Sequence, residues 1–165
     1  MISVIIVTGQ FVLLPRCYYK VGEGEALILN KMSRMLVKFD GGLAIPVFEK
    51  AHVVRITVQR IPCDCEVRSS DDDRLTLKAQ ALVRVNPTKE DILRAWKTYG
   101  AEMNDEEAII ATFRPKVIEA LRVVAMHTPN ATIHAREDYK ERVIAMIGTD
   151  LGGFMLEDLA IESVT

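Results

Sequence analysis

The stretch LTLKAQALVRVNPTKEDILRAWKTYG, residues 75–100, is the most informative about the fold, because a strand period and a helix period follow one another in it. Up to residue 85, apolar and polar side chains alternate, which predicts a β-strand with one buried face. After Asn86 and Pro87 the apolar residues recur at helical spacing. The residues expected to face the core are Leu75, Leu77, Ala79, Ala81, Val83 and Val85 on the strand, then Ile92, Leu93, Trp96 and Tyr99 on the helix. The stretch therefore predicts a strand that leads directly into an amphipathic helix.

The ends of this helix are marked by residues with capping chemistry. Thr88 is the expected N-cap, and Asp91 lies where a carboxylate interacts favourably with the helix N-terminus. Gly100 follows the last apolar position and is expected to end the helix. The first helix is thus predicted to span roughly residues 89–99.

Two further helices are expected downstream. Asn104 and Glu107 approximate a capping box for the second helix, in which Pro115 predicts a kink or break near Phe113. A third helix is expected from about residue 135 to 151, ended by a glycine pair. The final segment, FMLEDLAIESV, returns to strand character.

The residues before position 75 have strand character. Short apolar runs occupy residues 26–30 and 35–39, and residues 54–58 alternate as expected for a half-buried antiparallel strand. SSDDD, residues 69–73, is expected to form a polar turn. The predicted fold class is α+β, with a mostly antiparallel sheet and about three helices packed against it, in the C-terminal half before a closing strand.

Composition limits the function classes. The chain has 165 residues, enough for one domain with a real core, and a formal net charge of −2 that gives no reason to expect nucleic acid. It has three cysteines, an odd number that makes a poor disulfide framework. Cys63 and Cys65 would point the same way in a strand, so a reducing compartment is the simpler interpretation.

The first 14 residues, MISVIIVTGQFVLL, are mostly apolar and contain no charged side chain. They are shorter than the about 20 apolar residues that span a bilayer, and no basic region precedes them as in a secretory signal. Three interpretations stay open: a buried first strand, an interfacial or hairpin anchor, or the tail of a spanning helix. The basic residues Arg16 and Lys20 follow, as on the cytoplasmic side of membrane segments. The membrane-associating candidates are Ile2, Val4, Ile5, Ile6, Val7, Phe11, Val12, Leu13 and Leu14.

Residues with catalytic or metal-binding chemistry are scattered. His52, His127 and His134 are far apart, and Cys63 and Cys65 form one pair without a second pair downstream. The acidic run at residues 71–73 lacks the ligand spacing of a calcium loop. No motif of a phosphate loop, a nucleophile elbow or a zinc protease occurs. We therefore expect no catalytic residues, no metal and no cofactor, and predict that the chain is not an enzyme.

The ordered set of elements resembles the stomatin–prohibitin–flotillin family, also called the SPFH or band-7 domain, and flotillins in particular. RCYYKVGEGEALIL (residues 16–29) resembles the opening beside the membrane, and GGLAIPVFEKAHVVRITVQRI (residues 41–61) the Gly-Gly…Ile-Pro stretch. VRSSDDDRLTLKAQALVRVN (residues 67–86) resembles the Ser-Asp turn and alternating strand. Residues 132–143 and 156–164 look like the last helix and strand. The likeness covers nearly all of residues 16–165.

The resemblance implies a non-catalytic scaffold that oligomerises at membranes and organises membrane microdomains. Residues 1–15 would be the apolar membrane-associating segment or a truncated anchor, and residues 16–165 one SPFH-like domain without the family's coiled-coil stalk. The expected partners are membrane lipid, further copies of the chain and a membrane protein. The domain would lie on the cytoplasmic side of the membrane. Cys17 beside the anchor is a candidate for S-acylation, which occurs in some relatives.

Two other function classes stay open. One is an adaptor that binds and regulates a membrane protease or transporter. The other is an enzyme or metal protein that uses Cys63, Cys65 and a histidine.

Overall fold

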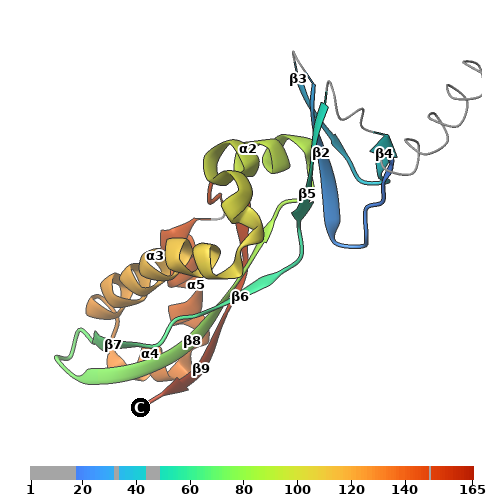
Figure 1. Ribbon diagram of the computed structural model, residues 1–165. Helices are drawn as coiled ribbons and strands as arrows, with labels where there is room; N and C mark the ends of the chain where they lie inside the picture. The colour runs from blue at the N-terminus through green and yellow to red at the C-terminus, as the bar shows by residue number, and fades with distance from the viewer. Residues whose placement is uncertain (1–17, 32–33, 44–48, 149) are drawn as a thin grey trace, which may run out of the picture.

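The computed structural model describes residues 18–31, 34–43, 49–148 and 150–165 (Figure 1). The strands are β1 (Tyr18–Tyr19), β2 (Glu25–Lys31), β3 (Arg34–Lys38), β4 (Gly42–Leu43), β5 (Glu49–Arg55), β6 (Gln59–Pro62), β7 (Cys65–Arg68), β8 (Arg74–Val85) and β9 (Phe154–Val164). The helices are α2 (Lys89–Tyr99), the 3₁₀ helix η1 (Gly100–Asn104), α3 (Glu106–Met126), α4 (Asn130–Ala135) and α5 (Glu137–Ile147). The molecule is elongated, with a small sheet at the N-terminal end and a larger sheet at the other end.

The small sheet is antiparallel, in the order β3-β2-β5, and the short ribbon of β1 and β4 lies beside it (Figure 1). Its central strand, β2, is buried on both faces because successive side chains of a strand point to opposite sides. Ala26 and Ile28 face the main core, whereas Leu27 and Leu29 form a second, smaller cluster. The small sheet is therefore covered on both sides.

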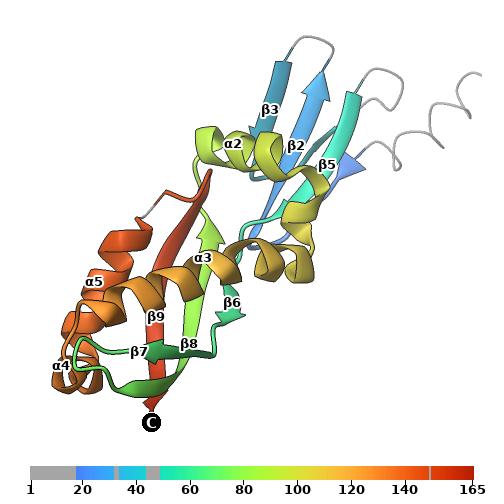
Figure 2. The ribbon, with the colours of Figure 1, turned by 90° about the vertical axis from the view of Figure 1, so that its left-hand side faces the viewer.

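The larger sheet is built on β8, which confirms the strand expected at residues 75–85. β6 and β7 pair with successive parts of one edge of β8, and β9 pairs along the other edge, all antiparallel. The side chains expected to face the core are all buried: Leu75, Leu77, Ala79, Ala81, Val83 and Val85. α3 and α5 cover this face of the sheet (Figure 2). The predicted α+β class and closing strand are confirmed.

One hydrophobic core extends through both sheets. It contains Val54 of β5, Phe113 of α3, Tyr139 of α5 and Phe154 of β9, all buried. Burial of a large apolar side chain contributes roughly 1.5–3 kcal/mol. The same core thus holds the small sheet, the helices and the large sheet together.

The prediction of one continuous strand over residues 54–58 is wrong. β5 ends at Arg55 and β6 begins at Gln59, so the alternating run is shared between two sheets. Between them Ile56 is half-buried and Val58 is exposed, and the backbone N–H of Ile56 bonds to Gly24 O at 2.8 Å. Period alone does not show where a chain leaves one sheet for another.

Two helix predictions also need correction. α3 continues without a break through Pro115, whose missing N–H would have met the carbonyl of the exposed residue Ala111, where water can replace it. The third predicted helix corresponds to α5, which begins at Glu137. The short helix α4 precedes it, was not predicted, and is separated from α5 at Arg136, which has a positive φ of 67°. The C-terminal end of α5 is Ile147, capped by Gly148, rather than Leu151.

Candidate functional site

Most of the predicted membrane-associating residues lie outside the described part of the chain. This holds for the apolar candidates from Ile2 to Leu14, for Arg16 and for Cys17. Lys20 is described: it is exposed and follows β1 in the connection to β2. The candidate site is therefore described from the structure that follows these residues, beginning at Tyr18.

The first described residues are fixed to the small sheet. Tyr19 and Val21 pack on the cluster of Leu27 and Leu29, on the face of β2 turned away from the main core. Tyr19 also pairs with Gly42 across the β1–β4 ribbon. The segment that follows residues 1–17 is thus attached to the outer face of the small sheet.

A glycine makes this attachment sterically feasible. Gly41 has a φ of +82°, and a Cβ atom there would lie 2.5 Å from the carbonyl oxygen of Tyr19. Any other residue would both strain the backbone and separate the two strands.

Aromatic and basic side chains lie next to this ribbon. Tyr18 is 56% exposed and Phe39, in the turn before β4, is 38% exposed. Lys20 and Lys38 are exposed close to them in the chain. Tyrosine and lysine are favoured at the headgroup level of a bilayer, because each combines an apolar part with a polar end.

The small sheet is joined to the rest of the molecule through α2 and η1. His52 of β5 stacks on Trp96 of α2, with ring centroids 4.6 Å apart. The side-chain amide of Asn104 donates from Nδ2 to Val53 O and accepts at Oδ1 from the Arg55 N–H, both at 2.8 Å. Asn104 therefore satisfies the edge of β5 as a neighbouring strand would, whereas the N-cap of α3 is Asp105. The expected capping role of Asn104 is wrong.

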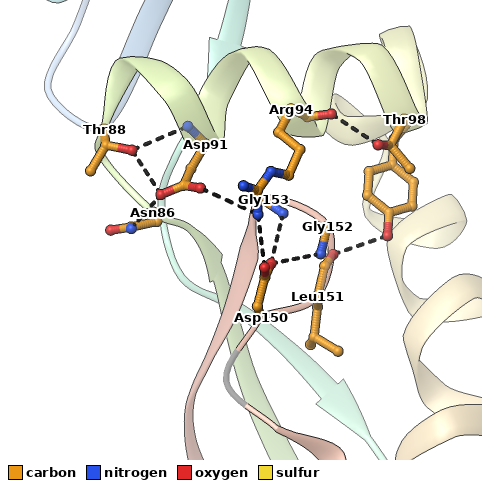
Figure 3. A network of polar contacts seen from close by, with 10 residues as sticks. Asn86, Thr88, Asp91, Arg94, Thr98, Asp150, Leu151, Gly152 and Gly153 are labelled. Atoms are coloured by element: carbon orange, nitrogen blue, oxygen red, sulfur yellow. Dashed lines mark hydrogen bonds and ion pairs between the residues drawn. The ribbon is translucent and has the colours of Figure 1, made fainter.

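A polar network fixes α2 to the larger sheet (Figure 3). The predicted cap is confirmed: Thr88 Oγ1 accepts from the Asp91 N–H at 3.1 Å. The Asp91 carboxylate in turn accepts from Asn86 Nδ2 at 2.6 Å and from the Thr88 hydroxyl at 2.7 Å. Arg94 completes the network with an ion pair to Asp150 at 2.7 Å.

Asp150 organises the turn that leads into β9. Its Oδ1 accepts from the N–H groups of Gly152 at 3.1 Å and Gly153 at 3.4 Å. These two hydrogen bonds, together with the nearby Arg94 guanidinium, hold the pKa of Asp150 below its ordinary value. The Tyr99 hydroxyl donates to Leu151 O at 3.1 Å in the same turn.

Asp150 and the true role of Asn104 were not predicted from the sequence. An aspartate two residues before a glycine pair is a signal for a side chain that bonds to its own turn, so Asp150 was detectable. Asn104 had no such signal, since its partners are about 50 residues away and nothing local points to them.

The cysteine pair occupies the core. Cys63 and Cys65 are both buried, and burial raises the pKa of the Cys63 thiol to about 11 and raises that of Cys65. The Cys63 thiol donates to Ile61 O at 3.4 Å. Both groups are therefore protonated at neutral pH and poorly nucleophilic.

The acidic turn at residues 69–73 has structural partners. Asp71 accepts from the Asn130 N–H at 2.7 Å, Asp73 from Asn130 Nδ2 at 2.8 Å, and Asp72 pairs with Arg68 at 2.5 Å. Within the described ranges, His, Cys, Asp and Glu side chains form no group of three or more that could hold a metal ion. The turn serves to join the β7–β8 hairpin to α4.

A helix that spans a bilayer needs about 20 mostly apolar residues. Among residues 18–31, 34–43, 49–148 and 150–165, no helix is both long and apolar enough to cross a membrane.

Together these features define a class: an α+β domain with two antiparallel sheets, in which an apolar stretch of sequence precedes the small sheet. The family model of the SPFH domain / Band 7 family matches residues 19–165 of the chain. The chain belongs to this family. Its members generally associate with membranes, oligomerise and act as non-catalytic scaffolds. No curated protein matches the chain in a sequence search.

Proposed function

We propose that this chain is the membrane-associated scaffold domain of a flotillin-like protein, which self-assembles and organises membrane microdomains. The observation that carries the proposal is the attachment of the first described residues, Tyr18 to Val21, to the outer face of the small sheet. Family membership supports it independently. Residues 1–15 would associate with the membrane and residues 16–165 would form one domain on its cytoplasmic side.

The residues next to the ribbon fit such an arrangement. Apolar side chains at residues 1–14 would enter the acyl region, and Tyr18 with Lys20 would lie at the headgroups. Arg16 and Lys20 would be attracted to anionic lipid, at about 1 kcal/mol for each basic residue near the surface. Acylation of Cys17 would add a second anchoring signal, as stable anchoring by lipid requires.

Deletion of residues 1–14 tests the anchor against its strand alternative. If these residues are the anchor, the deleted protein unfolds at the same urea concentration as the full chain but no longer floats with phosphatidylcholine–phosphatidylserine vesicles. If they are a buried strand, deletion lowers the unfolding midpoint. Unchanged flotation would refute the anchor.

A matched pair of variants separates apolar insertion from general damage. Ile5→Asp with Phe11→Asp places two charges among the apolar residues, whereas Thr8→Asp with Gln10→Asp places the same charges at polar positions. The first pair should lower vesicle binding much more than the second. Equal losses would indicate an electrostatic effect of charge rather than insertion.

The adaptor alternative is separated by affinity capture from native membranes. Recovery of the chain with itself and with lipid supports the scaffold. Stoichiometric recovery of a membrane protease or transporter would favour the adaptor instead.

A further inference from the structure

The outward side of α3 carries a groove that no other described element covers. It has a volume of about 630 Å³, and apolar surface comes from Pro115, Ile118, Val123 and Met126. Met126 is 53% exposed, a large fraction for an apolar side chain. A hollow of about 280 Å³ continues over β7 and shares Met126 and Arg122 with the groove. An apolar strip of this kind is typical of a docking surface.

The groove has an excess of positive charge. Four arginines, Arg68, Arg74, Arg114 and Arg122, line the two hollows against two glutamates, Glu66 and Glu119. Arg122 Nε donates to the backbone oxygen of Glu66 at 3.3 Å, and Arg68 pairs with Asp72. Within the described chain, Arg74 and Arg114 have no carboxylate within ion-pair distance. A partner for this groove should therefore bring carboxylates.

The outer side of α5 has the complementary composition. Asp138, Glu141, Arg142 and Ala145 line a hollow of about 410 Å³, and Glu137 is exposed in the same helix. Two acids against one arginine leave a net charge of −1 in this hollow, and Lys140 of the same helix is paired with Asp158 at 2.8 Å. No ion pair of Asp138 or Glu141 occurs among the described residues.

α5 also carries an exposed apolar side chain outside this hollow. Met146 is 49% exposed. The outer side of α5 thus carries carboxylates and an exposed apolar side chain. These are the kinds of group that can contact the arginines and the apolar side chains of the α3 groove.

The two surfaces belong to different helices of one layer. α3 packs against β6 and β7, α5 packs against β9, and the two helices pack against each other (Figure 2). Within one chain the α5 surface cannot enter the groove, because both helices are held in this layer by the core. A contact between them requires two copies.

We propose that the α3 groove binds the outer surface of α5 of a second copy of this chain. The proposal deepens the self-assembly proposed above by naming the surfaces in contact. The contact is head-to-tail: each copy uses its groove on one neighbour and its α5 on the other. Such a contact leaves one groove and one α5 surface free in every dimer, so it continues to a ring or a filament.

Photo-crosslinking of the full chain on phosphatidylcholine–phosphatidylserine vesicles tests the contact. Benzoylphenylalanine is placed at Met126, and the crosslinked peptides are identified by mass spectrometry. Crosslinks should join residue 126 to peptides of residues 137–147 of another copy and give a ladder of species. Crosslinks from groove to groove, to other parts of the chain or to no second copy would refute the proposal.

Charge reversal on each side provides the second measurement. Arg122→Glu in the groove and Glu141→Lys on α5 should each lower the crosslink yield at least fivefold. Lys78→Glu makes the same kind of change at an exposed position of β8, on the sheet face away from the helices, and should leave the yield unchanged. Circular dichroism confirms that each variant is folded. A crosslink yield that is unchanged in both charge-reversal variants would overturn the proposal.

Mixing the two variants distinguishes head-to-tail from symmetric contact. A Glu141→Lys chain that carries the probe has an intact groove, and an isotope-labelled Arg122→Glu chain has an intact α5. Together they should form crosslinked pairs of one light and one heavy chain, through the intact groove of the first and the intact α5 of the second. An absence of mixed pairs would contradict the geometry.

Flotation of the same samples keeps this test separate from the proposed function. Variants that float with vesicles but do not crosslink retain the membrane role and support the contact. A wild-type chain that floats without the expected crosslinks refutes the contact alone. A wild-type chain that does not float refutes the membrane role, and the crosslinks in solution still decide the contact.

Discussion

The side chain of Asn104 closes the edge of β5 by donating from Nδ2 to the backbone oxygen of Val53 at 2.8 Å. Its Oδ1 accepts from the Arg55 N–H at the same distance. A single amide thus stands where the next strand would be, and couples η1 to the small sheet.

Asn104→Ala should lower the free energy of unfolding by about 1–2 kcal/mol, because two hydrogen bonds to the β5 backbone are lost. Hydrogen exchange should also show loss of protection at the Arg55 amide. Glu102→Ala, at an exposed position of the same 3₁₀ helix, is the control and should change neither quantity by more than about 0.5 kcal/mol. Retained Arg55 protection in Asn104→Ala would contradict the strand-like role.

Gly153→Ala should be among the more damaging single changes in the chain. Gly153 has a φ of +99°, and a Cβ there would lie 2.4 Å from Asp91 O and 2.7 Å from Ala95 N. We expect a loss of roughly 3 kcal/mol in urea unfolding, from backbone strain together with displacement of α2.

Gly148→Ala separates the two causes. Gly148 has a φ of +76°, but a Cβ atom there would meet nothing within 4 Å, so its substitution should cost only the strain, about 1 kcal/mol. Equal losses for both variants would show that α2 does not rest closely on this turn.

Lys140→Met should raise the pKa of Asp158. In the native protein the hydrogen bond from Lys140, at 2.8 Å, and that from the Leu159 N–H hold the pKa of Asp158 below its ordinary value of 3.8. Without Lys140 the Leu159 contribution remains, so the pKa rises but stays lowered. Carboxyl NMR over the acidic range measures both, and an unchanged pKa of Asp158 would contradict the pairing.

The same pair determines a pH dependence of stability. Because the folded pKa of Asp158 is depressed, its contribution is complete above the unfolded value near 3.8 and is lost as pH falls through the lower folded pKa. Since both side chains are partly exposed, the loss is about 0.2–1 kcal/mol. Lys140→Met should reduce this loss, whereas the pKa of Asp150, lowered by Gly153, Gly152 and Arg94, should remain lowered and serves as the internal control.

The thiols of Cys63 and Cys65 should resist alkylation in the native protein. Burial raises the pKa of Cys63 to about 11 and raises that of Cys65, so neither forms much thiolate at neutral pH. In a Cys17→Ser background, iodoacetamide should label the urea-unfolded chain fully before it labels the native chain measurably. Rapid labelling of the native protein would contradict this prediction and would indicate that Cys63 or Cys65 is reactive.

Local patterns predicted the elements whose partners are near in sequence. The alternation of residues 75–85 predicted β8, Thr88 predicted the start of α2, and Gly100 its end. In each case the signal is the side-chain period or a cap within one helical turn. Both depend only on residues that are near in sequence. The ordered set of phrases also led to the family that matches residues 19–165.

Patterns failed where two distant parts of the chain compete for a residue. The side-chain amide of Asn104 could cap α3, but it forms hydrogen bonds with the edge of β5, and Asp105 caps the helix instead. Residues 54–58 could form one strand, but β5 and β6 belong to different sheets. Pro115 could break a helix, but packing of Phe113 and Val117 in the core keeps α3 continuous.

The α+β class, the order of the elements and the apolar character of residues 1–14 could all be predicted, since they follow from composition and side-chain period. Three features became visible only in the folded chain. These are the sheet that each strand joins, the packing of Tyr19 and Val21 on the outer face of the small sheet, and the contacts of Asn104 and Asp150 that fix η1 and α2. The tertiary structure also shows that the arginines of α3 and β7 share one groove while the acids of α5 lie apart from it. The reason is that contacts between residues about 50 or more positions apart depend on how the whole core closes, and no local period encodes them.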